Sequence, residues 1–324
     1  MADKSKIEWT DATWNPIRGC SRVSEGCRNC YAERTAARFS GPGQPYEGLA
    51  WPTGARAVPD KIESLATGGK SHGWTGEVRF IPELLEQPLR WRRPRKIFVN
   101  SMSDLFHEKV TKDWLDQIFA AMLVSPQHIF QILTKRPERM RDYLCNVRAR
   151  DVEPHMARLR PGYGRLDWPW RNVWLGVSVE DQKTADQRIP LLMDTLAAVR
   201  WVSYEPALGP VNFRRWMDPY SDAIPRPLLR WLVAGGESGP GARPAHPDWI
   251  RTARDQCRAV GVSFFFKQWG EWIPVNQRVE TGDARLHRGM DMDGVRFLRL
   301  GKKIAGHLLD GRVWQQFPMA GVRA

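Results

Sequence analysis

Short apolar runs follow one another along the second part of the chain, separated by stretches of helical periodicity. The runs are continuous and rich in β-branched and aromatic residues, which is typical of parallel strands buried on both faces. They cover residues 95–100, 128–134, 172–179, 200–206, 231–237 and 262–268. Apolar residues recur at helical spacing over residues 111–124, 186–199 and 246–262. The pattern predicts repeated β-α units and therefore a parallel sheet.

Polar residues follow nearly every predicted strand. They are Asn100, Ser101 and Asp104; Thr134 and Lys135; Ser178 and Glu180; Tyr204 and Glu205; Glu237 and Ser238; and Lys267 and Gln268. A (β/α) barrel builds its active site from loops at the carboxyl ends of its strands. We therefore predict an α/β fold with a partial (β/α) TIM-type barrel of six or seven mostly parallel strands.

The domain organisation follows from where the repeated β-α pattern begins and ends. We expect the barrel over residues 1–270, with a Gly- and Pro-rich inserted loop at about 40–76. Residues 271–324 alternate charged and Gly-bearing pieces, which predicts a β-rich C-terminal appendage. The two glycines at 235–236 lack the spacing of a nucleotide-binding motif, and we interpret them as a close backbone approach to a ligand or as a plain turn.

Composition excludes several classes of protein. The 324 residues are 42% hydrophobic and 26% charged, as in globular rather than disordered or fibrous chains. No apolar stretch is long enough for a membrane span or a signal peptide, so we expect a cytoplasmic protein without a membrane partner. The formal charge of +13 favours a polyanionic partner such as nucleic acid. Most of the 16 tryptophans sit beside apolar segments and are predicted to lie in the core.

Three of the five cysteines, Cys20, Cys27 and Cys30, lie within the stretch GCSRVSEGCRNCY. An odd cysteine count in a cytosolic chain favours metal binding over disulfides, and flanking glycines give the loop freedom to converge three thiolates on one ion or cluster. A four-iron cluster on three cysteines keeps one iron open. The alternative is zinc with His107 or His128 as the fourth ligand.

The residues around this cluster have simpler predictions. YAERTAARF, directly after Cys30, has the composition of a helix with Glu33 and arginines on its outer face. Cys145 and Cys257 lie in predicted helical stretches and are expected to take no part in metal binding.

The tight three-cysteine loop ahead of a strand and helix series resembles the radical S-adenosylmethionine superfamily. The usual spacing there is Cys-x3-Cys-x2-Cys, whereas the first gap here is six residues and an aromatic, Tyr31, follows the third cysteine. The segments KIEWTDATWNPIRGCSRVSEGCRNCYAERTA, NSMSDLFH, LTKRPERM, LGVSVED, VSYEPALGPV and VAGGESGPGARP together resemble a phage-associated protein family of unassigned function. The order of the central strand segments is also distantly similar to spore photoproduct lyase, a radical enzyme that acts on DNA.

The resemblance implies a function and a cofactor. Cys20, Cys27 and Cys30 would ligate a [4Fe–4S] cluster whose open iron binds S-adenosylmethionine, and reductive cleavage would give a 5′-deoxyadenosyl radical. The enzyme would modify or repair nucleic acid and would need an electron donor. The resemblance identifies no protein partner and no catalytic residue.

Strand-end residues are the candidates for the remaining contacts. We expect Ser101, Asp104, Ser178 and Glu180 to contact the cosubstrate. Lys135, Arg136, Glu205, Glu237 and Lys267 are the candidates for substrate binding, the cations because they suit phosphate or carboxylate. The alternative function is a non-catalytic, zinc-stabilised, basic nucleic-acid-binding protein. Acidic residues at successive strand ends favour the enzyme, since a pure binder needs only a basic groove.

Overall fold

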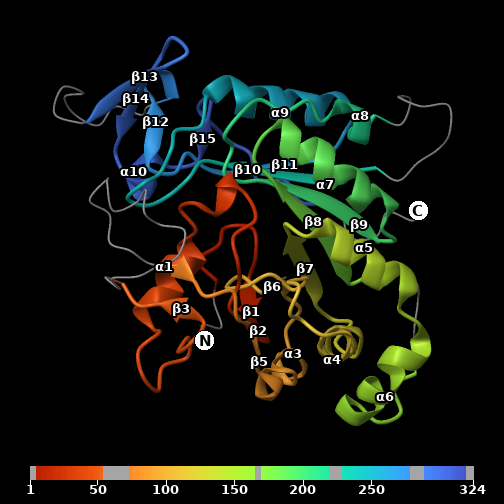
Figure 1. The fold of residues 1–324 in the computed structure, drawn as a ribbon. Coiled ribbons are helices and arrows are strands. Elements are labelled where there is room, and N and C mark those ends of the chain that lie inside the picture. The colour runs from red at the N-terminus through yellow and green to blue at the C-terminus, as the bar shows by residue number, and fades with distance from the viewer. Residues whose placement is uncertain (1–4, 54–72, 165–168, 219–227, 278–287, 319–324) are drawn as a thin grey trace. The chain divides into compact units, whose positions relative to one another are not determined.

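The structure is a computed structural model of the chain and describes residues 5–53, 73–164, 169–218, 228–277 and 288–318. Over these residues its largest sheet has seven strands in the order β1-β6-β7-β8-β9-β10-β11 (Figure 1). The strands are β1 (Ala12–Trp14), β6 (Lys96–Val99), β7 (Ile129–Thr134), β8 (Val173–Val179), β9 (Val199–Tyr204), β10 (Trp231–Gly235) and β11 (Ser263–Gln268). The predicted α/β class and the parallel sheet of six or seven strands are confirmed.

Helices connect the strands at most of the expected places. The longer ones are α1 (Tyr31–Arg38), α4 (Lys112–Leu123), α5 (Pro137–Asn146), α6 (Ala149–Leu159), α7 (Gln182–Asp194) and α9 (Pro247–Ala259). The short ones are α3 (Gln87–Arg90), α8 (Arg214–Met217) and α10 (Lys302–Ala305), with 3-10 turns η1 (Glu25–Cys27), η2 (Pro82–Leu84) and η3 (Val275–Gln277). No helix in the described ranges has the length and hydropathy to cross a membrane.

The predicted helix at 186–199 is displaced in the structure, where α7 starts earlier, at Gln182. Asp181 caps this end because its carboxylate accepts from the backbone N–H of Thr184 at 2.8 Å, and the Asp181 N–H donates back to Thr184 Oγ1 at 3.1 Å. The periodicity identified the apolar face of the helix, but the cap decides where it begins.

Contacts within the chain divide it into two compact units. The first comprises Met1–Trp174 with Leu196–Ala198, and the second Leu175–Thr195 with Val199–Ala324. In the first unit β1 pairs parallel with β6, which pairs parallel with β7. Trp14 of β1 is fully buried, and its ring centroid lies 5.8 Å from that of Phe130 in β7.

The first unit also holds two short antiparallel strand pairs. The pair β2 (Ile17–Arg18) and β5 (Arg79–Phe80) follows β1, and β3 (Ala50–Trp51) pairs with β4 (Gly73–Trp74). The β3–β4 pair joins two segments of the predicted inserted loop. Residues 54–72 of that loop lie outside the described residues.

The second unit has a core of tryptophans between parallel strands. β9 pairs with β10 and β10 with β11, and Trp201 lies beside Trp231 with ring centroids 5.1 Å apart. A Cβ on Gly176 of β8 would meet the Trp201 ring at 2.4 Å, so this position must be glycine for the indole to fit. The predicted core role is confirmed for both tryptophans, which are fully buried.

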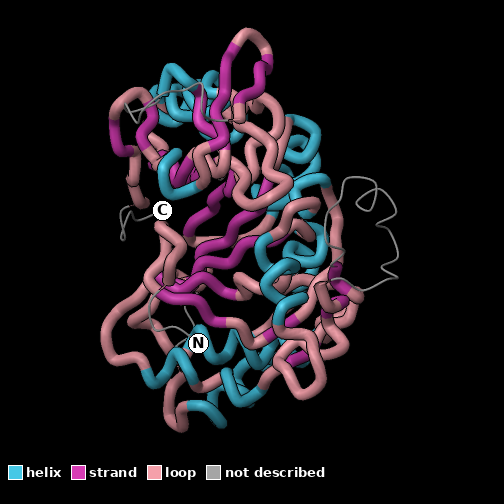
Figure 2. Tube along the Cα trace, turned by 90° about the vertical axis from the view of Figure 1, so that its left-hand side faces the viewer, coloured by secondary structure: helices cyan, strands magenta, loops and turns pink. Residues whose placement is uncertain are grey.

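The described residues after 271 include two small antiparallel sheets. An antiparallel sheet has the order β12-β14-β13, from β12 (Trp272–Pro274), β13 (Gly289–Met292) and β14 (Val295–Arg299). A last hairpin pairs β15 (Leu308–Leu309) with β16 (Arg312–Val313). Figure 2 draws these strands in magenta with their connecting turns in pink.

The turn of the last hairpin is fixed to α9 by charge. Asp310 accepts hydrogen bonds from Arg251 Nη2 at 2.7 Å, from Arg254 Nη1 at 2.6 Å and from Gln277 Nε2 at 2.8 Å. The Arg251 guanidinium in particular holds the pKa of the Asp310 carboxyl well below its usual range. The hairpin is therefore held in place by a carboxylate that must stay ionised.

This carboxylate predicts an acid-sensitive contribution to stability. Because its pKa is lowered in the folded state, the contribution is present above the unfolded value of about 3.9 and is lost as the pH falls through the folded value. Asp310→Asn should lower the melting temperature at pH 7 and flatten its decline below about pH 4. Thermal melts between neutral and acidic pH measure this. Asp291→Asn, which removes an exposed pair with Arg296, is the control and should change little. An unchanged acid profile in Asp310→Asn would contradict the assignment.

Candidate functional site

The three-cysteine loop lies between β2 and α1, at the carboxyl end of β1. Gly19 starts the loop with a φ of 90°, and a Cβ there would meet the carbonyl oxygen of Glu77 at 2.1 Å. Gly19 also forms a parallel bridge with Ser103, which follows β6. The start of the loop is therefore fixed against two neighbouring segments, and glycine is the residue that fits there.

The thiols of Cys20, Cys27 and Cys30 are half-buried and free of disulfides. Burial raises the pKa of Cys20 and of Cys30, and the nearby thiols raise both values further. Cys20 Sγ lies 3.4 Å from the Ser21 carbonyl oxygen, to which it donates.

Cys30 stands at the start of α1, where backbone N–H groups point along the helix axis. The backbone N–H groups of Glu33 and Ala32 lower the pKa of Cys30, against the larger effect of burial. A helix N-terminus stabilises a thiolate in this way, as it does other anions.

The donor set tests whether a metal group fits. In the ranges that the structure describes, no three His, Cys, Asp or Glu side chains are grouped closely enough to hold a metal ion. The chemistry of the three thiols nevertheless fits an iron–sulfur cluster, because desolvated thiols on one loop become thiolates when a cation binds them. Cys20 must then release the Ser21 carbonyl.

The position of Glu33 in the helix after the cysteines differs from the prediction. The expected outer-face position is wrong, since the side chain is only 1% exposed. Both carboxylate oxygens bind Arg22, with Nη2 to Oε2 at 2.5 Å and Nε to Oε1 at 3.0 Å, and Oε1 also accepts from the backbone N–H of Trp74 at 2.9 Å. Arg22 lies between Cys20 and Cys27, so this ion pair ties the middle of the loop to the helix.

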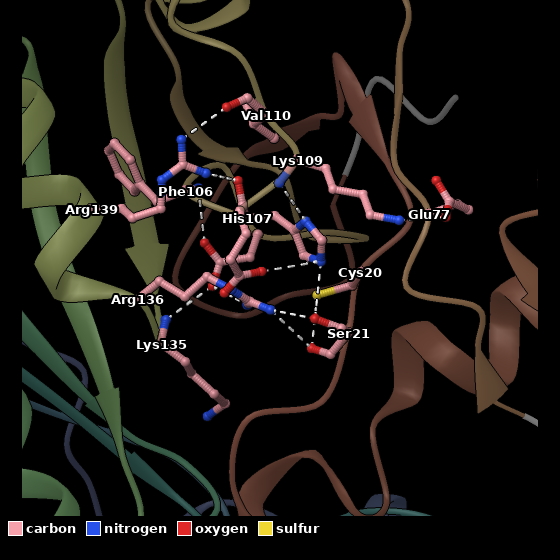
Figure 3. A network of polar contacts seen from close by, with 12 residues as sticks. Cys20, Ser21, Glu77, Phe106, His107, Lys109, Val110, Lys135, Arg136 and Arg139 are labelled. Carbon is pink, nitrogen blue, oxygen red and sulfur yellow. Dashed lines mark hydrogen bonds and ion pairs between the residues drawn. The ribbon is translucent and has the colours of Figure 1, made fainter. Parts of the chain in front are cut away.

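A second buried ion pair lies beside Cys20 (Figure 3). The Arg136 guanidinium, 5% exposed as a residue, binds Asp104 Oδ2 at 3.1 Å and Glu108 Oε1 at 2.7 Å. Its Nη2 donates to Ser21 Oγ at 2.7 Å and to the Ser21 carbonyl at 3.3 Å. Arg136 therefore connects the cysteine loop to the segment after β6 and to the turn after β7.

Asp104 is fully engaged within the protein. Oδ1 accepts from Thr134 Oγ1 at 2.7 Å and from the Phe106 N–H at 3.0 Å, and Oδ2 accepts from the Lys135 N–H at 3.0 Å besides Arg136. Figure 3 shows the Lys135 side chain directed away from this network, to which its backbone N–H donates. The predicted cosubstrate role of Asp104 and the substrate roles of Lys135 and Arg136 stay predictions.

Of the two histidines considered as zinc ligands, His107 lies near the cysteines. Its Nε2 is 2.9 Å from Ser21 Oγ, and its Nδ1 accepts from the Lys109 N–H at 3.2 Å. Burial lowers the pKa of His107, so the ring is neutral and donates through Nε2. His128 precedes β7 and binds the Pro88 carbonyl at 3.0 Å, at the amino end of the parallel strands and thus away from the loop.

Ser101 contributes to the same strand end as the cysteine loop. Its hydroxyl donates to Asn15 Oδ1 at 3.1 Å, and its carbonyl accepts from the Tyr31 hydroxyl at 2.6 Å. The neighbouring Asn100 has a φ of 58° and is 2% exposed, so the chain turns sharply here. The predicted cosubstrate contact of Ser101 stays a prediction.

In the second unit the predicted residues also form ion pairs. Glu180 binds Arg188 Nη1 at 3.0 Å, and the same nitrogen donates to the Ser178 carbonyl at 2.7 Å. Glu237 binds Arg243 through Nη2 at 2.8 Å and Nε at 3.0 Å. Sequence reasoning missed both arginines, because they lie in a helix and a loop with no strand-end signal.

Glu205 and Lys267 come together across β10. Their carboxylate and ammonium groups lie 3.1 Å apart, at the ends of β9 and β11, and Ser203 Oγ donates to Glu205 at 3.2 Å. A Cβ on Gly235, between them, would meet Glu205 Oε1 at 2.9 Å. The absence of a side chain at this position lets the pair form.

The pair of glycines at 235–236 lies close to other parts of the protein. A Cβ on Gly236 would meet the Trp269 carbonyl oxygen at 2.0 Å, and one on Gly270 would meet that of Glu237 at 2.0 Å. Backbone packing between the segments after β10 and β11 therefore accounts for the need for glycine at Gly236 and Gly270. The interpretation of the glycines at 235–236 as a ligand contact stays a prediction.

Removing the Arg136 guanidinium should be costly. Arg136→Gln leaves buried Asp104 and the Ser21 hydroxyl without their cation, and we expect the free energy of unfolding to fall by about 3–5 kcal/mol. Arg141→Gln, which removes an exposed pair with Asp142, should change it by less than about 0.5 kcal/mol. Chemical denaturation measures both. A loss of under about 1 kcal/mol in Arg136→Gln would show that the network contributes no more than a surface pair.

Comparison with known proteins gives one match. A family model described as "Protein of unknown function (DUF5131)" matches residues 4–318. No curated protein and no solved structure matches the chain.

Proposed function

Because the chain belongs to the DUF5131 family, whose description assigns no function, we propose from its own residues that it is a radical S-adenosylmethionine enzyme acting on nucleic acid. The observation that carries the proposal is the three-thiol loop between β2 and α1. The pair of Arg136 and Asp104 contacts the start of this loop through Ser21, and the pair of Arg22 and Glu33 joins its middle to α1. These cysteines would hold a [4Fe–4S] cluster, and one iron would be without a protein ligand.

The chemistry that a [4Fe–4S] group supplies when bound is the one-electron reductive cleavage of S-adenosylmethionine, which yields a radical that abstracts hydrogen from the substrate. Residues of the chain fix the loop that would hold this cluster. Arg136 and Asp104 hold the start of the loop, and Arg22 and Glu33 hold its middle. The N–H groups at the start of α1 favour negative charge on Cys30.

The strand ends supply candidates for the other contacts. Ser101 donates to Asn15, which precedes the cysteine loop, and is the first candidate for cosubstrate binding in this unit. In the second unit Ser178 and Glu180 are the candidates for the cosubstrate, and Glu205, Glu237 and Lys267 for the substrate. An external electron donor is required by the chemistry.

Nucleic acid is the proposed substrate class because of charge. The chain carries 49 Lys and Arg against 36 Asp and Glu, a balance that favours phosphate backbones. Exposed arginines such as Arg92 and Arg93 add to this positive surface.

A zinc-stabilised nucleic-acid-binding protein is the second candidate. The position of His107 favours it, because the ring touches Ser21, the residue next to Cys20. To complete a three-cysteine, one-histidine site, Nε2 must give up the Ser21 hydroxyl.

Metal analysis separates the two candidates. Protein purified without oxygen should hold about four irons and four sulfides per chain, with a visible chromophore, and should release 5′-deoxyadenosine from S-adenosylmethionine with dithionite. Cys27→Ala should lose the bound iron and the chromophore.

Two other cysteines provide matched controls. Cys145→Ala removes an exposed thiol and Cys257→Ala a buried one in α9, and both should keep the wild-type iron content. Equal loss of iron in all three variants would contradict the ligand assignment. One zinc per chain without a chromophore would replace the enzyme by the binding protein.

Salt dependence tests the substrate class. If Lys and Arg side chains neutralise phosphates, affinity for single- or double-stranded DNA should fall steeply as the salt concentration rises. Fluorescence anisotropy with a labelled oligonucleotide measures the slope of log affinity against log salt concentration. A flat response would indicate a small-molecule substrate instead.

A further inference from the structure

Glu33 is a buried charge one helical turn beyond the third cysteine. Cys30 is the N-cap of α1 and Glu33 is the third residue of the helix, so the two lie three positions apart along its first turn. With the side chain 1% exposed, water screens this carboxylate little.

Arg22 opposes this charge from within the loop. It binds both oxygens of Glu33, and its Nη2 also lies 3.4 Å from the carbonyl of Arg28, between Cys27 and Cys30. The Arg22 side chain is 30% exposed, whereas that of Glu33 is 1% exposed. The anion is therefore the less screened member of the pair.

We propose that the ion pair of Arg22 and Glu33 sets the reduction potential of the iron–sulfur group on the three cysteines, with Glu33 lowering the potential and Arg22 raising it. This inference rests on the proposed function. Reduction takes one electron from a donor such as dithionite and adds one negative charge beside three thiolates. A fixed carboxylate nearby opposes that charge, and a fixed guanidinium favours it.

The pair also holds the loop in place mechanically. The electrostatic role and the mechanical role predict different shifts of the reduction potential when one partner is removed. Loss of either partner breaks the same hydrogen bonds and would loosen the loop in the same way. An electrostatic role requires that removing the anion and removing the cation move the potential in opposite directions. The direction of the shift therefore separates tuning from bracing.

The experiment is a redox titration of protein reconstituted with iron and sulfide under anaerobic conditions, followed by visible absorbance and electron paramagnetic resonance. Glu33→Gln should titrate at a more positive potential and Arg22→Gln at a more negative one. We expect a change of about tenfold in the reduction equilibrium, or about 59 mV for one electron. Glu25→Gln is the matched control, because this loop carboxylate is 76% exposed and its removal should leave the potential unchanged.

Iron and sulfide contents are measured for every variant before titration. If Glu33→Gln does not fold, Arg22→Gln is tested alone: the inference expects a more negative potential, and a more positive or an unchanged potential would overturn it. Shifts in the same direction, or no shift in either variant, would reduce the pair to a brace and leave the proposed function standing. A wild-type protein without iron would overturn the proposed function and this inference with it.

Discussion

Burial of the Arg136 guanidinium is the constraint around which the first unit is arranged. Such a cation is costly to remove from water unless carboxylates and carbonyls surround it. Asp104 follows β6, Ser21 belongs to the cysteine loop, and Arg136 itself follows β7. One charged group thus holds three strand ends together, and it fixes the start of the loop that carries Cys20.

The large strands were predictable because burial on both faces leaves a continuous apolar run, as in the WLVAG of β10. β1 was not predicted, since three residues give no pattern to detect. The cysteine loop followed from spacing alone. Its supports did not, because Glu33 finds a partner 41 residues away at Trp74, and local periodicity carries no information about such contacts. The cap at Asp181 shows the same limit at the scale of one helix turn.

The acidic residues at the strand ends have a different meaning in the structure from the one that the sequence suggested. Asp104, Glu180, Glu205 and Glu237 each bind an arginine or lysine. A carboxylate that is already paired gives no independent reason to favour catalysis over simple binding. The argument for an enzyme therefore depends on the three thiols, because the surrounding ion pairs give no structural reason for three cysteines in this loop.

The glycines after β10 and β11 have a consequence for reading relatives of this chain. Gly236 and Gly270 each face a carbonyl oxygen that any Cβ would strike, so selection will retain glycine at both whether or not a ligand binds there. Invariance of the two positions across the family would then record a steric requirement of two crossing backbones. Evolutionary evidence for a binding site has to come from positions where a side chain fits and is nonetheless preserved.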